Sequence, residues 1–246
     1  MIELKRVTKT YFRGRGGMQV TVKAVEQVDA TIQAGEFVVI TGRSGCGKTT
    51  LLNLIAGLAR PDSGKVFFEG IDIWAMKDEE ISALRNRKIG LMFQVPSLMP
   101  TLNVLDNVVL PTLFAPKETR KDAYQRGREA LDSVGLSGLM DAFPRHLSAG
   151  EEKRVVIARA IVNRPPVLLA DEPTANLDEK TEGEVMALLQ TIHTVGATLL
   201  LVTHHPGLIG YGTRHIAMSD GKLSEDKKNL EIGGGKNSAE RKETGK

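Results

Sequence analysis

This sequence contains one cysteine, no long apolar run and only a small excess of basic over acidic residues. Cys46 alone, among 246 residues, excludes an internal disulfide and suits a reducing compartment. No stretch of about 18 apolar residues occurs, and the first residues lack an apolar signal core, so we expect a chain without a transmembrane helix or leader. The 33 Lys and Arg residues oppose 30 Asp and Glu residues. This balance does not indicate a nucleic-acid partner.

Apolar, β-rich runs alternate along the chain with patterns typical of helices. Continuous apolar runs suit strands that are buried on both faces, as in a parallel sheet. The alternation of strands with helices predicts an α/β fold. The predicted strands are residues 36–41, 88–94, 166–171 and 197–204. The predicted helices are residues 48–56, 78–87, 119–134, 151–162 and 179–195.

Three further segments differ in pattern from this core. The first strand-like segments, "IELKRVTKTYF" and "VKAVEQVDATIQAG", alternate in polarity and indicate an antiparallel β edge. The strand signal disappears after Gln94, where a proline-rich stretch and helical patterns follow. We therefore predict an α/β core over 1–94 and 166–225 and a helical subdomain over 95–165. Residues 226–246 contain few large apolar residues and a triple glycine, which predicts a flexible tail.

The segment "GRSGCGKT" follows a predicted strand, opens a predicted helix and fits the phosphate-loop pattern G-x-x-x-x-G-K-[ST]. Its glycines allow backbone N–H groups to surround phosphate oxygens, and the helix dipole favours the same anion. We expect Lys48 to reach the β- and γ-phosphates and the Thr49 hydroxyl to bind Mg²⁺. Cys46 is interpreted as a small loop residue and not as a reactive thiol. The predicted nucleotide-binding residues here are Gly42, Ser44, Gly45, Cys46, Gly47, Lys48, Thr49 and Thr50.

Two carboxylates end the apolar run "PVLLADEPTANLD". Asp171 ends a buried strand, where it can reach Mg²⁺ through Thr49 or water. Glu172 follows, and we expect it to orient the water that attacks the γ-phosphate. An isolated Asp-Glu pair is usually a solvated turn, but the upstream phosphate loop favours the catalytic interpretation.

Polar side chains also end two other predicted strands. Gln94 can contact the metal or the attacking water, although alone it reads as an ordinary polar residue at a strand end. His204 lies at the carboxyl edge of the sheet, where it can hydrogen-bond the γ-phosphate. His205 is interpreted as part of a turn before Pro206. The remaining histidines are expected to be structural or on the surface: His146, His193 and His215.

A second anion site is indicated by "LSAGEE" at 147–152, where Ser148 resembles a helix cap. This segment, the phosphate loop, Gln94, "LLADE", "ANLD" and His204 together resemble the nucleotide-binding subunit of ABC transporters over residues 2–224. The resemblance implies a P-loop ATPase core with a mostly parallel sheet, an N-terminal antiparallel β edge and an inserted helical subdomain. It also implies that ATP and Mg²⁺ are bound and that Tyr11 stacks on adenine, although an aromatic residue in a first strand is usually part of the core.

The same resemblance implies a role for the second anion site. In this family two subunits pack head to tail and enclose two ATP molecules, so Ser148 and Gly150 are expected to meet the γ-phosphate held by a second copy. Asp178, in "ANLD", is expected at the same interface.

This signature departs from the family pattern at two positions. Ala149 replaces a glycine, which is a small change. Glu151 replaces the usual glutamine, and its carboxylate suits the helix dipole but repels an incoming phosphate. We expect Lys153 and Arg154 to offset that repulsion.

Within the family, "FQVPSLMPTLNVLDNVVLP" resembles the lipoprotein-release, macrolide-export and cell-division ATPases (LolD, MacB and FtsE types). The resemblance implies a peripheral subunit on the cytoplasmic face of the inner membrane. It also implies an integral membrane permease that docks near residues 94–105, through Pro96, Leu98, Pro100 and Leu102. The activity implied is lipoprotein, lipid, drug or peptide export.

One other functional class fits the sequence equally well, and two further classes fit it less well. A regulator of the cell envelope or of division that moves no cargo, as in the FtsE type, is not separable from a transporter by sequence. A soluble ABC ATPase of translation or DNA repair usually shows two cassettes or a coiled-coil insertion, and neither occurs here. A P-loop kinase or GTPase is disfavoured by LSAGE and His204.

Overall fold

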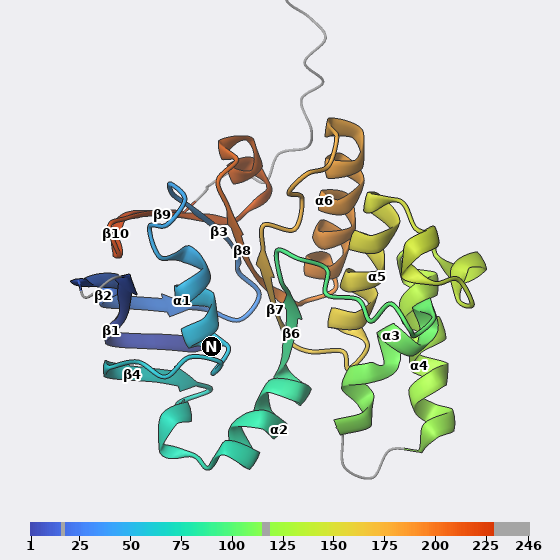
Figure 1. Cartoon of the computed structure of the whole chain (residues 1–246), viewed down its shortest axis with the longest axis horizontal. Helices are drawn as coiled ribbons and strands as arrows, with labels where there is room; N and C mark the ends of the chain where they lie inside the picture. Colours follow the sequence, from blue (N-terminus) through green and yellow to red (C-terminus); the bar gives the residue numbers. More distant parts are fainter. Residues whose placement is uncertain (16–17, 115–118, 229–246) are drawn as a thin grey trace, which may run out of the picture.

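The computed structural model of the protein describes residues 1–15, 18–114 and 119–228. A six-stranded sheet in the order β10-β9-β3-β8-β7-β6 lies at its centre (Figure 1). Its parallel strands are β3 (Phe37–Thr41), β6 (Ile89–Met92), β7 (Val167–Asp171), β8 (Thr198–Thr203) and β9 (Arg214–Ser219). The strand β10 (Lys222–Lys228) pairs with β9 in the antiparallel direction. The predicted α/β fold is confirmed, and the apolar runs became parallel strands because both of their faces are covered.

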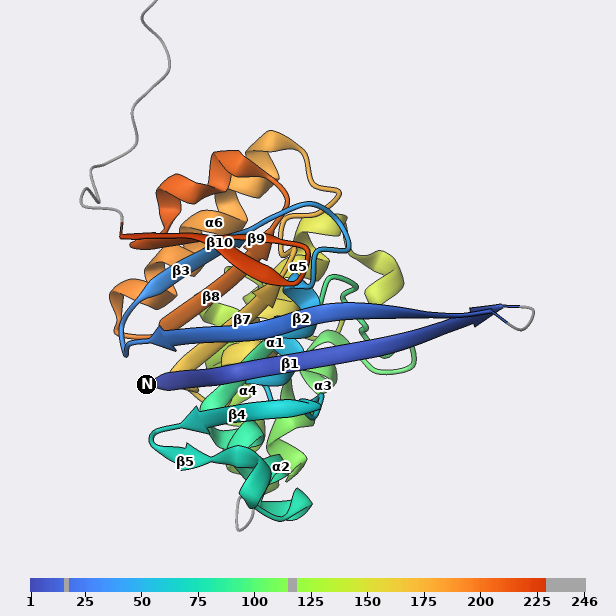
Figure 2. The ribbon, with the colours of Figure 1, turned by 90° about the vertical axis from the view of Figure 1, so that its left-hand side faces the viewer.

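The N-terminal segments form a second, antiparallel sheet in the order β2-β1-β4-β5. Its strands are β1 (Ile2–Arg15), β2 (Met18–Ile32), β4 (Ser63–Phe68) and β5 (Ile71–Asp72). The first two make a long hairpin that projects beyond the rest of the molecule (Figure 2). The predicted antiparallel edge is thus a separate sheet. The sequence pattern did not predict β4, because that strand begins with polar, exposed residues.

Helix α1 (Lys48–Ile55) lies between the two sheets. Its buried Leu51 and Leu54 share a hydrophobic core with Ile2 of β1 and Val38 of β3. Burial of such side chains contributes about 1.5–3 kcal/mol each and holds the phosphate loop against both sheets.

Four of the remaining helices, α3 to α6, cover the other side of the main sheet, whereas α2 lies near the end of β6 and packs its Leu84 against the core that contains α1 (Figure 1). These helices are α2 (Asp78–Lys88), α3 (Val104–Val109), α4 (Arg120–Ser133), α5 (Ala149–Ile161) and α6 (Glu179–Thr194). Short 3₁₀ segments lie between the helices and strands: η1 (Ile73–Ala75), η2 (Leu110–Phe114), η3 (Ser137–Leu139), η4 (Pro144–His146) and η5 (Pro206–Tyr211). The described residues between 95 and 165 contain helices and no strand. Within the described part of the chain, no helix combines the length and apolar character needed to cross a bilayer.

The helical segment and the main sheet share one continuous core. Val108 of α3, Leu131 of α4 and Ile157 of α5 are fully buried in the same cluster as Leu168 and Leu201 of the sheet. The segment therefore packs directly on the strands, and α5 in particular contacts β6.

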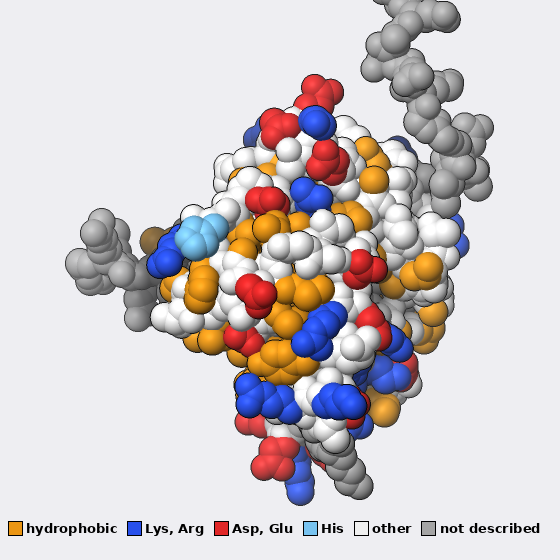
Figure 3. Space-filling view, turned by 90° about the vertical axis from the view of Figure 1, so that its right-hand side faces the viewer, with side chains coloured by type: hydrophobic (Ala, Val, Ile, Leu, Met, Phe, Trp, Pro, Cys, Tyr) orange, Lys and Arg blue, Asp and Glu red, His pale blue; other side chains and the backbone are white. Residues whose placement is uncertain are grey.

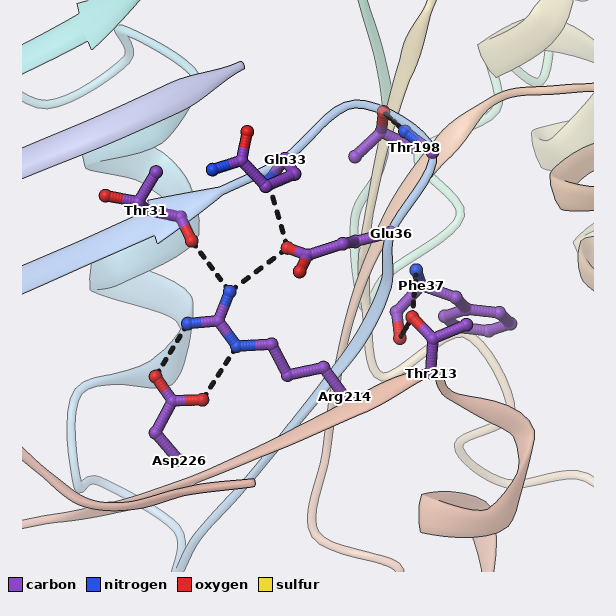
Figure 4. A network of polar contacts seen from close by, with 9 residues as sticks. Thr31, Gln33, Glu36, Phe37, Thr198, Thr213, Arg214 and Asp226 are labelled. Carbon is purple, nitrogen blue, oxygen red and sulfur yellow. Dashed lines mark hydrogen bonds and ion pairs between the residues drawn. The ribbon is translucent and has the colours of Figure 1, made fainter. Parts of the chain in front are cut away.

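Arg214 at the start of β9 joins the two sheets (Figure 4). Its guanidinium donates to both carboxylate oxygens of Asp226, at 2.7 and 2.6 Å, to Glu36 at 3.0 Å and to the carbonyl of Thr31 at 2.7 Å. Asp226 is consequently part of β10, and the predicted tail is wrong for residues 226–228, because this bidentate ion pair stabilises a polar strand. The rest of the predicted tail, 229–246, lies outside the described residues.

Candidate functional site

The phosphate loop joins the end of β3 to the start of α1. Gly47 directly precedes the helix with φ of 109°, and a Cβ at this position would overlap the carbonyl oxygen of Ala24. Only glycine therefore fits here. The Lys48 ammonium donates to the carbonyls of Gly42, at 2.7 Å, and of Arg43, at 3.1 Å. These bonds hold its charge at the mouth of the loop.

A cavity of about 610 Å³ opens over this loop, which is within the range of small-ligand sites. Residues from six separate parts of the chain line it: Tyr11, Val22, Ala24, Ser44, Gly45, Gly47, Lys48, Thr49, Thr50, Gln94, Glu172 and His204. The structure thus brings most of the predicted site residues together. Tyr11 is 40% exposed at the cavity wall, so it is a surface aromatic and not a core residue. Such a ring is available for stacking.

Two residues of the predicted loop set do not line the cavity. Cys46 is buried, its N–H donates to the carbonyl of Arg43, and its carbonyl accepts from Gly221. Gly42 contributes the carbonyl that holds Lys48. Both residues shape the loop from behind, which agrees with the interpretation of Cys46 as a small residue.

Asp171, at the end of β7, supplies a buried carboxylate behind the cavity. Burial raises the pKa of its carboxyl, while a hydrogen bond from Thr49 and the charge of Lys48 act against that rise. Its Oδ1 atom is buried without a hydrogen-bond partner. A partnerless carboxylate oxygen beside a threonine hydroxyl fits Mg²⁺, which prefers oxygen ligands. Thr49 and Asp171 would hold such an ion, with Gln94 nearby on the cavity wall.

Glu172 leaves the strand in an unusual conformation, with φ of 48°. A non-glycine residue with this φ stores backbone strain and is typical of functional sites. Its N–H donates to Val202 of β8 at 2.9 Å, and its Oε1 lies 2.9 Å from Nδ1 of His204. The two predicted catalytic side chains are therefore directly paired. His205 forms a similar pair with Glu182 of α6, at 3.2 Å, which sequence analysis missed.

Gln94 follows β6, and α5 holds the backbone of the segment after it. The Lys153 ammonium donates to the Gln94 carbonyl at 3.1 Å, and Arg159 donates to Pro96 at 2.7 Å and Ser97 at 3.0 Å. Lys153, expected to offset the repulsion between Glu151 and phosphate, is buried and makes its hydrogen bond to Gln94. Helical spacing could have shown this, since position 153 shares a face with the buried positions 156, 157 and 160.

The signature residues lie outside this cavity. Ser148 caps α5 and is exposed, and its Oγ accepts from the N–H of Glu151 at 3.3 Å. Asp178 caps α6 and accepts from the N–H and the hydroxyl of Thr181, at 3.0 and 2.7 Å. A Cβ on Gly150 would lie 2.6 Å from Cγ2 of Thr181. The starts of α5 and α6 therefore pack closely together, with Gly150 as the required contact point.

Known proteins resemble this chain over nearly all of its described length. A protein-family model described as "ABC transporter" matches residues 25–175. An uncharacterized ABC transporter ATP-binding protein of Thermotoga maritima is 42% identical, covering 91% of this chain and 93% of that protein. The cell division ATP-binding protein FtsE of Escherichia coli K12 is 43% identical, covering 91% of this chain and 97% of that protein.

Two further comparisons concern a longer protein and a solved structure. The macrolide export ATP-binding/permease protein MacB of Chlorobaculum tepidum is 40% identical over 93% of this chain, which spans only 34% of that protein. The solved dimeric structure of the ATP-binding cassette MJ0796, bound to ADP and Pi, has a TM-score of 0.84 at 38% identity. It covers 93% of this chain and 98% of the solved chain.

Proposed function

Because this chain belongs to the ABC transporter family, we propose that it drives a separate membrane protein through ATP-dependent, head-to-tail pairing of two copies. The chain is an ATPase that uses ATP with Mg²⁺. One observation carries the proposal: the capped, exposed Ser148 lies outside the cavity that contains Lys48 and Glu172. An anion site that does not serve its own subunit's nucleotide is explained if it completes the site of a second copy.

The composite site would combine two complementary sets of groups. One copy supplies the phosphate loop with Lys48, and the other supplies Ser148, Gly150 and the start of α5. A helix start with a small residue at its tip favours an anion through its N–H groups and dipole. Asp178 would lie at the same interface, since Gly150 packs against Thr181. The dimeric solved relative supports this arrangement.

The residues around the γ-phosphate would divide the work of hydrolysis. Glu172 orients the attacking water and accepts its proton, and the strained turn aims its carboxylate into the cavity. His204 uses Nδ1 to hold Glu172, so Nε2 is the nitrogen that remains for the γ-phosphate. Bound Mg²⁺ would neutralise charge on the phosphate oxygens. The Gln94 side chain would contact the metal or the attacking water.

A groove of about 600 Å³ between α2, η2 and α5 is the proposed docking site for the membrane protein. Phe93 and Phe114 line it and are 42% and 77% exposed. On the face formed by the helical segment, hydrophobic side chains gather between charged ones (Figure 3). Leu98, expected to be a docking contact, is partly buried against the core. A short helix of the partner could fill this groove with an apolar face.

Replacing Phe114 with glutamate should weaken membrane association by about thirtyfold, because a charge would replace an aromatic anchor worth about 2 kcal/mol. Binding of the purified variant to membranes of the source cell measures this, and basal ATPase activity should not change. Val195→Glu is the matched control, since Val195 is 82% exposed and lies outside the groove. If Phe114→Glu binds membranes as well as Val195→Glu does, the partner docks elsewhere.

The proposed cargo is a lipoprotein, lipid, drug or peptide, exported from the cytoplasmic face of the inner membrane. MacB-type relatives support this class. A second candidate is control of the cell envelope or of division without transport, supported by the near full-length match to FtsE. The membrane protein that co-purifies with the wild-type chain, but not with Phe114→Glu, would discriminate between them.

A further inference from the structure

Glu151 and Ser148 form a closed hydrogen-bonded pair at the start of α5. The Glu151 Oε2 atom accepts from the N–H and from the hydroxyl of Ser148, both at 2.8 Å. In return, the N–H of Glu151 donates to the Ser148 oxygen. This capping box engages the single hydroxyl proton of Ser148 within its own subunit.

The proposed composite site needs that same hydroxyl proton for the γ-phosphate. Bonds from the N–H and the hydroxyl of Ser148 hold the pKa of the Glu151 carboxyl below its usual range. The carboxylate is therefore ionised at neutral pH. A phosphate oxygen and a carboxylate cannot both accept one proton, and two anions this close repel each other.

We propose that Glu151 occupies the anion position of the signature in the free subunit and competes there with the γ-phosphate bound to the second copy. This inference rests on the proposed head-to-tail pairing and deepens it. This competition weakens the ATP-driven pairing of two copies. When the γ-phosphate leaves the signature, Ser148 can again donate to the Glu151 carboxylate.

The surrounding charges neutralise the Glu151 carboxylate only in part. Lys153 is buried and donates to Gln94, so it does not face the carboxylate. Arg154 is the basic residue whose charge acts on Glu151. Arg154 lies three positions further along α5, so a Glu151 carboxylate displaced from Ser148 can form an ion pair with it. The Glu151–Ser148 pair can then open without unfolding the start of the helix.

The test uses subunits that carry Glu172→Gln, so that ATP is bound but not consumed. Sedimentation at saturating ATP and Mg²⁺ measures the dimer dissociation constant. Adding Glu151→Gln should lower this constant by about tenfold or more, because a charged acceptor no longer holds Ser148. The melting temperature should not change, since glutamine also forms a capping box.

Two control variants separate this effect from its alternatives. Glu151→Ala should also tighten the dimer, which excludes a new contact made by glutamine. Glu152→Gln removes the same charge from the next position but frees no bond of Ser148, so it should change the constant less than about twofold. Equal tightening by Glu152→Gln, or no tightening by Glu151→Gln in a parent that dimerises, would overturn the role of Glu151. If the parent and both Glu151 variants stay monomeric with ATP, the proposed pairing itself is wrong.

Discussion

The Glu172→Gln protein should bind ATP as the wild type does and hydrolyse it about 10²–10⁴ times more slowly. Glutamine keeps the size of the side chain and can still pair with His204, but it cannot accept a proton from water. Because ATP then persists in the site, ATP-bound dimers should accumulate. Phosphate release under single-turnover conditions, together with dimer content by size-exclusion chromatography, measures both effects.

Glu182→Gln is the matched control for this experiment. Glu182 pairs with His205 as Glu172 pairs with His204, but it does not line the cavity. Its loss should leave turnover within about twofold of the wild type, because an exposed pair of this kind contributes little. Near wild-type turnover by Glu172→Gln would contradict the catalytic assignment.

Heterodimers that carry two defects on the same subunit or on different subunits should show which subunit's bound ATP the signature residues contact. One heterodimer carries Lys48→Ala and Ser148→Asp on the same subunit, with a wild-type mate. If the signature acts across the interface, both composite sites are then defective. The other heterodimer carries the two changes on different subunits, and one site remains complete. We expect the second heterodimer to retain ATP and dimer contacts more than about tenfold better, as judged by pull-down through two different tags.

Ser148→Asp is preferred to a change at Gly150, where any side chain would overlap Thr181 within the same subunit. Aspartate keeps the helix cap and adds a negative charge where phosphate approaches. Ser148→Asn, which caps equally well without the charge, is the control and should be far less damaging. If the heterodimer with both changes on one subunit retains ATP and dimer contacts better, the signature acts within its own chain.

The parts of this protein that the sequence determined by itself depend on short-range interactions. The phosphate loop is predictable because its turn, the Lys48 contacts and the following helix arise within a few residues of each other. The cap at Ser148 is predictable for the same reason, since its partner is three positions away. The buried strands are predictable because a continuous apolar run suits only a position covered on both faces.

Other features were decided only by the tertiary structure, because they depend on which distant segments meet. The pairing of Glu172 with His204 requires β7 and β8 to end side by side, and the strained turn at Glu172 sets its direction. Lys153 became a buried contact of Gln94, and not a counter-charge for Glu151, because α5 packs that face against β6. Asp226 became part of a strand because Arg214 lies opposite it. In each case a polar group found a partner from another element, which only the packing of the elements brought within reach.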